Sequence, residues 1–138
     1  MAVRRHEPYL SVDFRVWLGS GDDGAMGFCR VEFPAFPVPI PASGADVEPA
    51  RDRSTLLLRR GFDGQLAVYA WWNRARGAKR LRGETVRVEL LGPRHRPVAA
   101  WVFSGCRPVR LSYSPLDASL SCVLMETLEL SFETMSME

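Results

Sequence analysis

The fold of this chain is decided by residues 55–73, which read Thr-Leu-Leu-Leu-Arg-Arg-Gly-Phe-Asp-Gly-Gln-Leu-Ala-Val-Tyr-Ala-Trp-Trp-Asn. The three leucines at 56–58 form an apolar run that ends at two arginines, and a run this short suits a buried strand better than a helix. Gly61 and Gly64 follow and supply the backbone freedom that a tight corner needs. Asp63 is the expected N-cap of a helix, because its carboxylate can accept hydrogen bonds from the free N–H groups of the first turn.

A helix is predicted over residues 65–76, where no proline interrupts the chain and apolar residues recur at helical spacing. Gly77 suits the position that follows the last helical turn. Trp71 and Trp72 widen the apolar stripe. The face expected to be buried consists of Leu66, Tyr69, Ala70 and Asn73.

Alternation of apolar and polar residues predicts strands in the rest of the chain. The predicted strands cover residues 9–18, 27–33, 84–91, 98–106, part of 107–118, and 120–133. The first two are expected to pair as a hairpin. The last carries Glu126 as the one polar residue on its apolar face. Together the pattern predicts a mainly β fold with one helix, an antiparallel β-sandwich or barrel-like sheet with the helix laid against it.

The chain of 138 residues is expected to form one domain, residues 1–138, with a loose N-terminus at residues 1–8. Residues 34–52 form a proline-rich loop or arm, because closely spaced prolines exclude both a helix and a ladder strand. Phe36, Val38 and Ile40 make this loop unusually apolar. Two readings stay open: the segment lies across its own core, or it is an arm that packs on a neighbouring molecule.

Charge is distributed unevenly along a chain whose net charge is only +2. Residues 1–50 hold four arginines against seven acidic residues, a balance of −3. Residues 51–110 hold thirteen arginines and one lysine against four acidic residues, a balance of +10. Residues 111–138 hold five acidic residues and no basic one, a balance of −5. A basic middle is typical of nucleic-acid binding, or of a surface that faces an acidic part of the same molecule or of the next copy.

Residues that could carry catalysis or a metal are sparse. The chain has no nucleophile-elbow, phosphate-loop or dinucleotide-binding motif. His6 and His95 have no Cys, Asp or Glu at ligand spacing, and Cys29, Cys106 and Cys122 are far apart, which indicates buried free thiols. We therefore predict no catalytic site, no cofactor and no metal, and hence no enzyme. Glu126 is expected to pair with an arginine, such as Arg59, Arg60 or Arg110.

A basic connector follows the predicted helix and is the strongest sign of nucleic-acid binding. Its side chains could pair with phosphates while Trp71 and Trp72 stack on bases. The tryptophans also fit the buried face of the helix, so a solvated or protein-facing patch is the preferred interpretation and nucleic acid is not expected as a specific ligand. The basic residues are Arg74, Arg76, Lys79, Arg80 and Arg82.

The expected cellular compartment follows from the lack of a membrane-spanning stretch and of a secretory signal. No stretch approaches the ~20 consecutive apolar residues of a membrane helix, and the first residues lack the apolar core of a secretory signal. Assembly in the cytoplasm is expected.

Several short sequence motifs, taken in their order along the chain, resemble those of the tail tube proteins of contractile phages and of contractile injection systems. The phrases are Arg59-Arg60-Gly61, Trp72, Trp101-Val102-Phe103, Pro108, Leu116-Asp117-Ala118 and Glu126-Thr127-Leu128-Glu129-Leu130. This resemblance implies a fold related to the haemolysin-coregulated protein, with six copies closing a ring and rings stacking into the hollow inner tube of a phage tail or tail-like particle. The implied partners are other copies of the chain and sheath, baseplate or spike proteins. The proline-rich run departs from the family pattern, so the main tube subunit and the ring that joins tube to baseplate and spike both stay open.

The resemblance also assigns provisional roles to surface residues, because ring closure needs two different complementary surfaces on each subunit. The predicted subunit interface consists of Phe36, Val38, Ile40, Arg59, Arg60, Arg74, Arg76, Lys79 and Arg80. The predicted lumen-facing residues are Arg15, Arg87, Glu89, Thr127 and Glu129. The alternative function is a monomeric β-barrel binding module for a small ligand or single-stranded nucleic acid.

Overall fold

The computed structural model describes residues 7–19, 25–38, 55–77 and 82–138, which form seven strands and one α-helix. No helix in these ranges is long and apolar enough to cross a membrane. The elements are β1 (Phe14–Leu18), β2 (Arg30–Glu32), β3 (Leu56–Gly61), α1 (Ala67–Gly77), β4 (Glu84–Leu91), the short 3-10 helix η1 (Pro93–His95), β5 (Pro97–Tyr113), β6 (Met125–Ser131) and β7 (Thr134–Met137).

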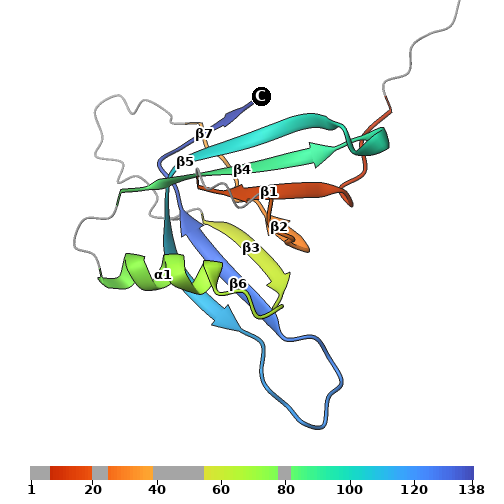
Figure 1. Ribbon diagram of the computed structural model, residues 1–138. Coiled ribbons are helices and arrows are strands. Elements are labelled where there is room, and N and C mark those ends of the chain that lie inside the picture. The colour runs from red at the N-terminus through yellow and green to blue at the C-terminus, as the bar shows by residue number, and fades with distance from the viewer. Residues whose placement is uncertain (1–6, 20–24, 39–54, 78–81) are drawn as a thin grey trace, which may run out of the picture.

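The strands form one antiparallel sheet in the order β1-β4-β5-β6-β3-β2, and β7 also pairs with β5. The 17-residue strand β5 pairs with β4 and β7 in its first part and with β6 in its second part. Figure 1 shows the result, an upper half of the sheet with β1, β4 and β7 and a lower half with β3 and β6, joined through β5. The predicted mainly β fold with one flanking helix is confirmed.

Two glycines allow β5 to pass from one half of the sheet to the other. Gly105 has a φ of +69°, in the left-handed region that favours glycine. Gly83, just before β4, lies so close that a Cβ added to it would be 2.5 Å from the Gly105 Cα. The bend therefore depends on two residues without side chains.

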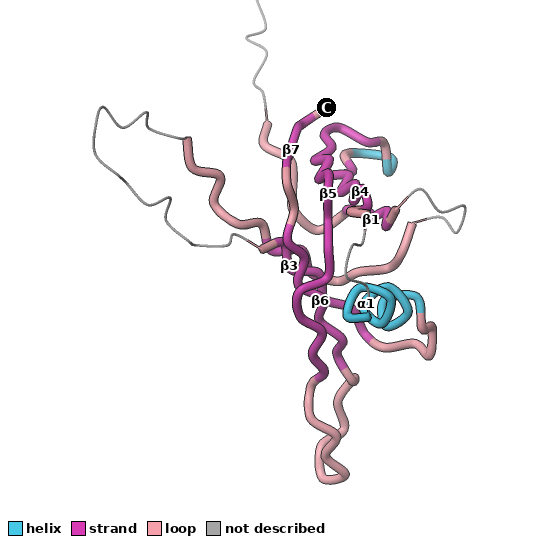
Figure 2. The backbone as a smooth tube through the Cα atoms, turned by 90° about the vertical axis from the view of Figure 1, so that its left-hand side faces the viewer, coloured by secondary structure: helices cyan, strands magenta, loops and turns pink. Residues whose placement is uncertain are grey.

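The core lies between the two halves. Fully buried apolar side chains come from both halves and from the helix: Val16, Leu56, Leu58, Val68, Val86, Phe103, Cys106, Leu128 and Leu130. The segment between β1 and β2 helps to close the sheet towards a barrel, because Met26 bridges to Val16 and the Cys29 N–H donates to the Arg59 carbonyl at 2.8 Å. Figure 2 shows α1 beside the sheet, and the helix packs against β5.

The helix exists as predicted, but its start and its buried face differ from the prediction. It begins at Ala67, and Asp63 accepts a hydrogen bond from the Gln65 N–H at 3.0 Å in the preceding turn instead of capping the helix. Its buried residues are Val68 and Trp71, whereas three of the residues predicted to be buried, Leu66, Tyr69 and Asn73, are exposed. Both sets have helical spacing, and packing against β5 selects the first.

Four strand predictions were wrong in extent or pairing. β1 begins only at Phe14, and Leu10 before it is 74% exposed. β2 pairs with β3 and not with β1, apart from the bridge at Met26. Residues 97–113 form one strand instead of two. The chain predicted as one strand at 120–133 is a loop up to Leu124 and then β6, and β7 follows unpredicted.

The expectation of three buried thiols holds for Cys106 alone, since Cys29 and Cys122 are exposed. Alternation in the sequence identifies strand-like segments but not the neighbours that would bury them.

Candidate assembly surfaces

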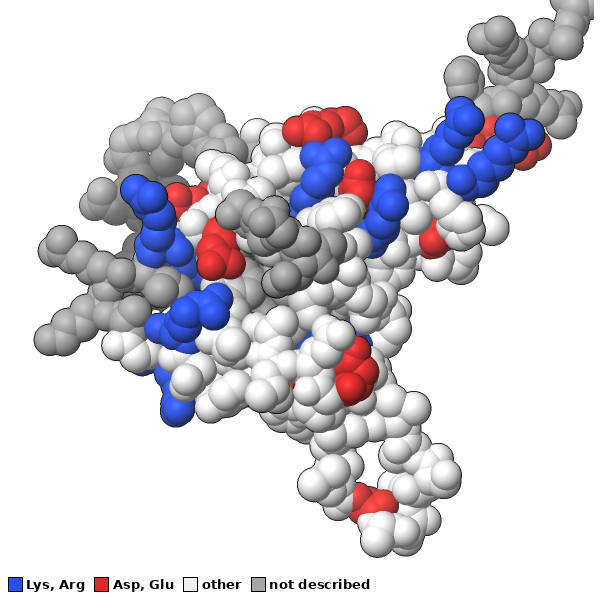
Figure 3. All heavy atoms as spheres, in the orientation of Figure 1, with Lys and Arg blue, Asp and Glu red and all other residues white. Residues whose placement is uncertain are grey.

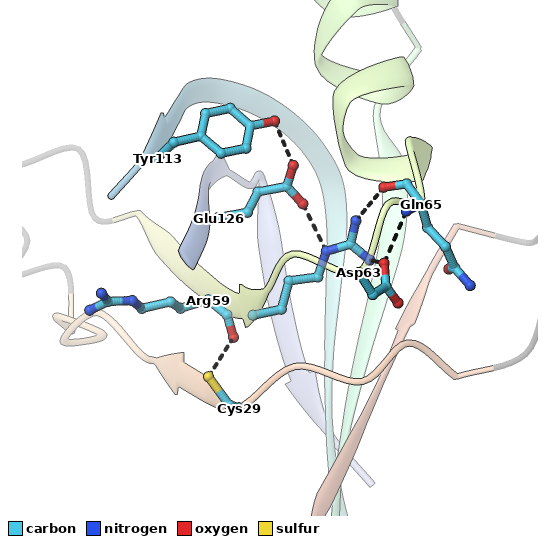
Figure 4. Close-up of polar contacts among 7 residues, drawn as sticks. Cys29, Arg59, Asp63, Gln65, Tyr113 and Glu126 are labelled. Carbon is cyan, nitrogen blue, oxygen red and sulfur yellow. Dashed lines mark hydrogen bonds and ion pairs between the residues drawn. The ribbon is translucent and has the colours of Figure 1, made fainter. Parts of the chain in front are cut away.

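A buried ion pair joins β3 to β6, close to the turn that follows β3. Arg60 Nε lies 2.7 Å from Glu126 Oε1, and the two side chains are 3% and 1% exposed. Arg60 Nη2 donates to the Gln65 carbonyl at 2.7 Å, and the Tyr113 hydroxyl donates to Glu126 Oε2 at 2.6 Å. Figure 4 shows Glu126 between Tyr113 and the turn that contains Asp63 and Gln65. The predicted pairing of Glu126 with an arginine is confirmed, and its partner is Arg60.

This network corrects one proposed role. Arg60 was predicted at the subunit interface, but its burial inside its own subunit removes it from the surface. The period of the strand explains the difference, because Leu56, Leu58 and Arg60 alternate with residues that face outward. Glu126 supplies the charge that a buried guanidinium requires.

The network also lies at the base of a loop whose second half, from residue 120, the sequence pattern predicted as strand. Residues 114–124, here called the projecting loop, leave the body of the molecule between β5 and β6 (Figures 1 and 2). Two hydrogen bonds close its base, from the Ser114 N–H to the Met125 carbonyl and from the Met125 N–H to Ser114 Oγ. Exposed apolar side chains lie along it: Leu116, Leu120 and Val123. Their apolar spacing is typical of a strand. The local sequence does not indicate whether another strand covers these side chains.

Two groups on β5 make the stability of the fold depend on pH at high pH. Burial and the hydrogen bond with Glu126 raise the pKa of Tyr113 to about 12, and burial raises the pKa of the Cys106 thiol from 9.0 to about 12. Both groups are neutral when protonated, so the unfolded chain loses these protons at lower pH than the folded chain does. Their contribution is present in full below about pH 9 and is lost as the pH rises towards about 12.

We expect the free energy of unfolding to fall between pH 9 and pH 11, as measured by urea denaturation at a series of pH values. Cys106→Ala and Tyr113→Phe should each flatten this slope. A slope unchanged in both variants would contradict the assignment.

Three predicted lumen residues lie together on the outer face of the upper half. Glu89 is 7% exposed and lies 3.2 Å from Arg15 Nε and 3.6 Å from Arg87 Nε. The Trp17 indole N–H donates to Glu89 at 2.8 Å, and Arg87 pairs with Glu138 at 2.6 Å. The face is therefore charged but locally neutralised.

The other two predicted lumen residues, Thr127 and Glu129, lie on the outer face of the lower half. Arg59 is directly opposite Thr127 in the strand register, and Arg110 lies 3.9 Å from Glu129. The five residues thus form two groups on different halves of the sheet. Arg59, predicted at an interface, belongs with the second group.

The exposed side of α1 carries a compact basic and aromatic patch. Arg74 and Arg76 occupy its last turn, and the helix holds no acidic residue. Arg76 lies 4.7 Å from the centre of the Trp72 ring, and Tyr69 packs beside the same ring. Figure 3 shows basic side chains gathered on the α1 side of the molecule. Of the other residues predicted for this interface, Lys79, Arg80 and Ile40 lie outside the described residues.

The beginning of the proline-rich segment covers its own core. The Phe33 ring lies 4.9 Å from Trp101 and the Phe36 ring 6.1 Å from Phe132, measured between centroids. Both phenylalanines remain about two-fifths exposed, at 40% and 41%, and Val38 is 83% exposed. At Phe33 and Phe36 the chain therefore lies across its own core, which is one of the two predicted alternatives. The outer faces of both rings stay available to another molecule.

A groove lies between α1 and residues 18–19 and 25–27, with a volume of about 850 Å³. Trp71 lines it, and the buried indole Nε1 has no hydrogen-bond partner among the described residues. Arg60 and Asp63 lie on one side, and Arg74 and Glu84 form a long ion pair of 3.9 Å on another. Within the described ranges, no group of His, Cys, Asp or Glu is arranged to hold a metal ion.

Comparison with known proteins places this arrangement in a family. The family model of the T4-like virus tail tube protein gp19 matches residues 45–136. No curated protein matches the chain in a sequence search.

Several solved structures share its fold. A chain in the cryo-EM structure of the anti-feeding prophage (AFP) baseplate is 23% identical, with a TM-score of 0.77 and 97% of each chain covered. A chain in the sheath/tube terminator of the PVC extracellular contractile injection system is 18% identical, with a TM-score of 0.77, covering 96% of this chain and 98% of that chain. Hcp1 from Flavobacterium johnsoniae is 13% identical, with a TM-score of 0.62, covering 90% of this chain and 93% of that chain.

The family match covers well over half of the chain and includes the Arg60–Glu126 network, the helix and the projecting loop. It agrees with the resemblance carried by the sequence phrases, and it favours a structural role over an enzyme or a monomeric binding module. The chain belongs to the T4-like virus tail tube protein family and is a structural tube subunit.

Proposed function

We propose that six copies of this chain close into a ring, and that rings stack to form the inner tube of the particle. The observation that carries the proposal is the separation of charge on one subunit. The α1 patch of Tyr69, Trp72, Arg74 and Arg76 is basic, while the chain after β5 is acidic. A head-to-tail ring needs two such different surfaces on every subunit.

In this ring the α1 patch faces an acidic surface of the next copy. An acidic side chain is available on the C-terminal part of the chain, where Glu133 is exposed. The exposed outer faces of Phe33 and Phe36 add apolar area to a contact between subunits, together with Val38.

We place Arg15, Arg87 and Glu89 on the wall of the lumen. Glu89 between two arginines, and Arg87 paired with Glu138, leave this face polar without a strong field of one sign. Such a wall would let cargo pass without binding it tightly. Thr127, Glu129 and Arg59 then form a separate polar face. A cryo-EM map of the assembled tube tests this placement, since Arg87 must point towards the tube axis.

Sheath and baseplate proteins are the proposed partners of the assembled tube. Similar chains occur in structures of an AFP baseplate and of a PVC sheath/tube terminator, which supports both partners. The main tube and the ring next to the baseplate are both compatible with these neighbours. Immunogold labelling of purified particles separates the two positions, because a main tube subunit labels the whole length of a broken tube.

Charge reversal on the α1 patch tests the ring. We expect the variant Arg74→Glu with Arg76→Glu to weaken subunit association tenfold or more, because like charges across an interface cost several kcal/mol. Sedimentation velocity over a range of protein concentrations measures the change, and negative-stain microscopy shows whether rings form.

A matched control carries the same kind of charge change on the β4–β5 turn, as Arg94→Glu with Arg96→Glu. This variant should assemble like the original protein. Normal rings from the α1 variant would remove the patch from the interface, and a protein that stays monomeric at high concentration without substitutions would contradict the tube proposal itself.

A further inference from the structure

Residues 33–37, here called the strap, contact the sheet through two aromatic side chains. The Phe33 ring lies 4.9 Å from Trp101 and 6.1 Å from Phe103, measured between centroids. The Phe36 ring lies 6.3 Å from Phe103 and 6.1 Å from Phe132. These separations are typical of packed aromatic rings. The three rings beneath the strap, Trp101, Phe103 and Phe132, are here called the aromatic cluster.

Side chains, and not the backbone, hold the strap in place. Among the described residues, no hydrogen bond joins residues 34–38 to the rest of the chain. Pro34 and Pro37 have no N–H group to donate. The strap therefore rests on the sheet as a bound peptide would, without adding a strand to it.

The spacing of the strap fits a polyproline II segment. Such a segment has three residues per turn, so side chains at i and i+3 lie on the same side. Phe33 and Phe36 have this spacing, and a proline follows each of them. Both rings contact the aromatic cluster, as the spacing requires.

The surroundings of the aromatic cluster are apolar. Trp101 and Phe103 are two residues apart in β5 and lie on one face of the sheet. The residues opposite them in the neighbouring strands share this face, and all are apolar: Val88 and Met137 opposite Trp101, and Val86 and Met135 opposite Phe103. An acidic peptide or a nucleic acid would find no charged partner at these positions.

Aromatic surfaces of this kind bind proline-rich segments in many proteins, because a polyproline II segment is already extended and loses little entropy on binding. The strap covers the aromatic cluster incompletely. Phe33 and Phe36 stay 40% and 41% exposed, and Met137 beside Trp101 is 58% exposed. Two partly exposed rings without backbone hydrogen bonds form a contact that another segment of the same type can replace.

We propose that the aromatic cluster is a binding site for proline-rich segments, which the strap fills in the free subunit and a proline-rich segment of a partner protein fills in its place. The partner's segment carries two large apolar side chains three residues apart, each followed by proline. The strap follows β2 directly, so it competes at a high effective concentration, of millimolar order or above. This inference concerns a single subunit and does not depend on the proposed ring.

A peptide added to the full chain tests the site. The probe is a fluorescein-labelled peptide that copies residues 32–38, Glu-Phe-Pro-Ala-Phe-Pro-Val, and fluorescence anisotropy measures its binding. The variant Phe33→Ser with Phe36→Ser lacks the internal competitor. We expect this variant to bind the peptide at least about tenfold more tightly than the unchanged chain, because a strap that occupies the site for nine-tenths of the time lowers the apparent affinity by that factor.

Two controls locate the bound peptide. Adding Trp101→Ala to the double variant should weaken peptide binding about tenfold or more, whereas adding Trp72→Ala, which changes another half-buried tryptophan on α1, should leave it unchanged. A peptide with serine at both phenylalanine positions should not bind. Equal effects of the two tryptophan substitutions would overturn the proposal, as would equal binding of the serine peptide.

A measurement on the unchanged chain covers the case in which the double variant does not fold. The chain is labelled with 5-fluorotryptophan, and the fluorine resonance of Trp101 is identified by its loss in Trp101→Phe. Millimolar peptide should shift this resonance, and the serine peptide should not. A Trp101 resonance that neither peptide moves, together with no peptide binding by a folded or unfolded double variant, would overturn the site and leave the ring proposal standing.

Discussion

Arg60→Ala should lower the free energy of unfolding by about 3–5 kcal/mol, because removal of one partner leaves the other as an unpaired buried charge. Glu126 is 1% exposed and would keep only the hydrogen bond from Tyr113. The Gln65 carbonyl would also lose its donor, which loosens the turn that leads into α1. In a chain of this size the loss corresponds to a fall in melting temperature of roughly 10–20 °C. Urea denaturation and calorimetry measure both quantities.

The neighbouring arginine provides the control for this experiment. Arg59 lies on the outward face of the same strand, so Arg59→Ala should change the free energy of unfolding by less than about 1 kcal/mol. The combined variant Arg60→Met, Glu126→Leu and Tyr113→Phe should recover most of the lost stability, because apolar groups of similar volume can replace a buried pair. Equal losses from Arg59→Ala and Arg60→Ala would contradict the structural role of the network.

Gly83→Val should destabilise the chain by about 3 kcal/mol, because the bend of β5 leaves no room for a side chain. A Cβ at Gly83 would lie 2.5 Å from the Cα and 2.6 Å from the carbonyl carbon of Gly105. These are backbone atoms at the point where β5 changes partners, so relief requires movement of the strand and not of one side chain. The melting temperature should fall by roughly 10 °C.

Gly77→Ala is the matched control for the bend. Nothing lies within 4 Å of a Cβ added to Gly77, which is the last residue of α1. This variant should be neutral or more stable by about 0.4–1 kcal/mol, since alanine restricts the unfolded chain. Comparable melting temperatures for Gly83→Val and Gly77→Ala would show that β5 does not depend on the close approach.

The two stability predictions also separate folding from assembly. Arg60 and Gly83 act within one subunit, whereas the charge reversal at Arg74 and Arg76 acts on the proposed contact between copies. An assembly defect in the charge-reversal variant with an unchanged melting temperature at low protein concentration would place its effect at the interface.

The class of fold, the positions of β3, β4 and α1, and the family could all be predicted from the order of residues alone. These features depend on residues close together in the chain: the leucine run before the glycine corner, the period of two at 84–91, and a proline-free helical stretch. The sequence also indicated that Glu126 needs an arginine, because a carboxylate on an apolar strand face cannot stay unpaired.

Three features depend on contacts between distant segments: the arginine that pairs with Glu126, the face of α1 that is buried, and the partner of each strand. Arg59 and Arg60 are adjacent in sequence, and the pairing of β3 with β6 determines which of them faces Glu126. The helix offered two stripes of similar spacing, and contact with β5 buries Val68 and Trp71. The same apolar alternation that forms β6 continues through Leu120 to Leu124, where no strand covers it and the chain becomes the projecting loop. Local periodicity is a property of neighbouring residues, whereas burial depends on segments that are distant in the sequence.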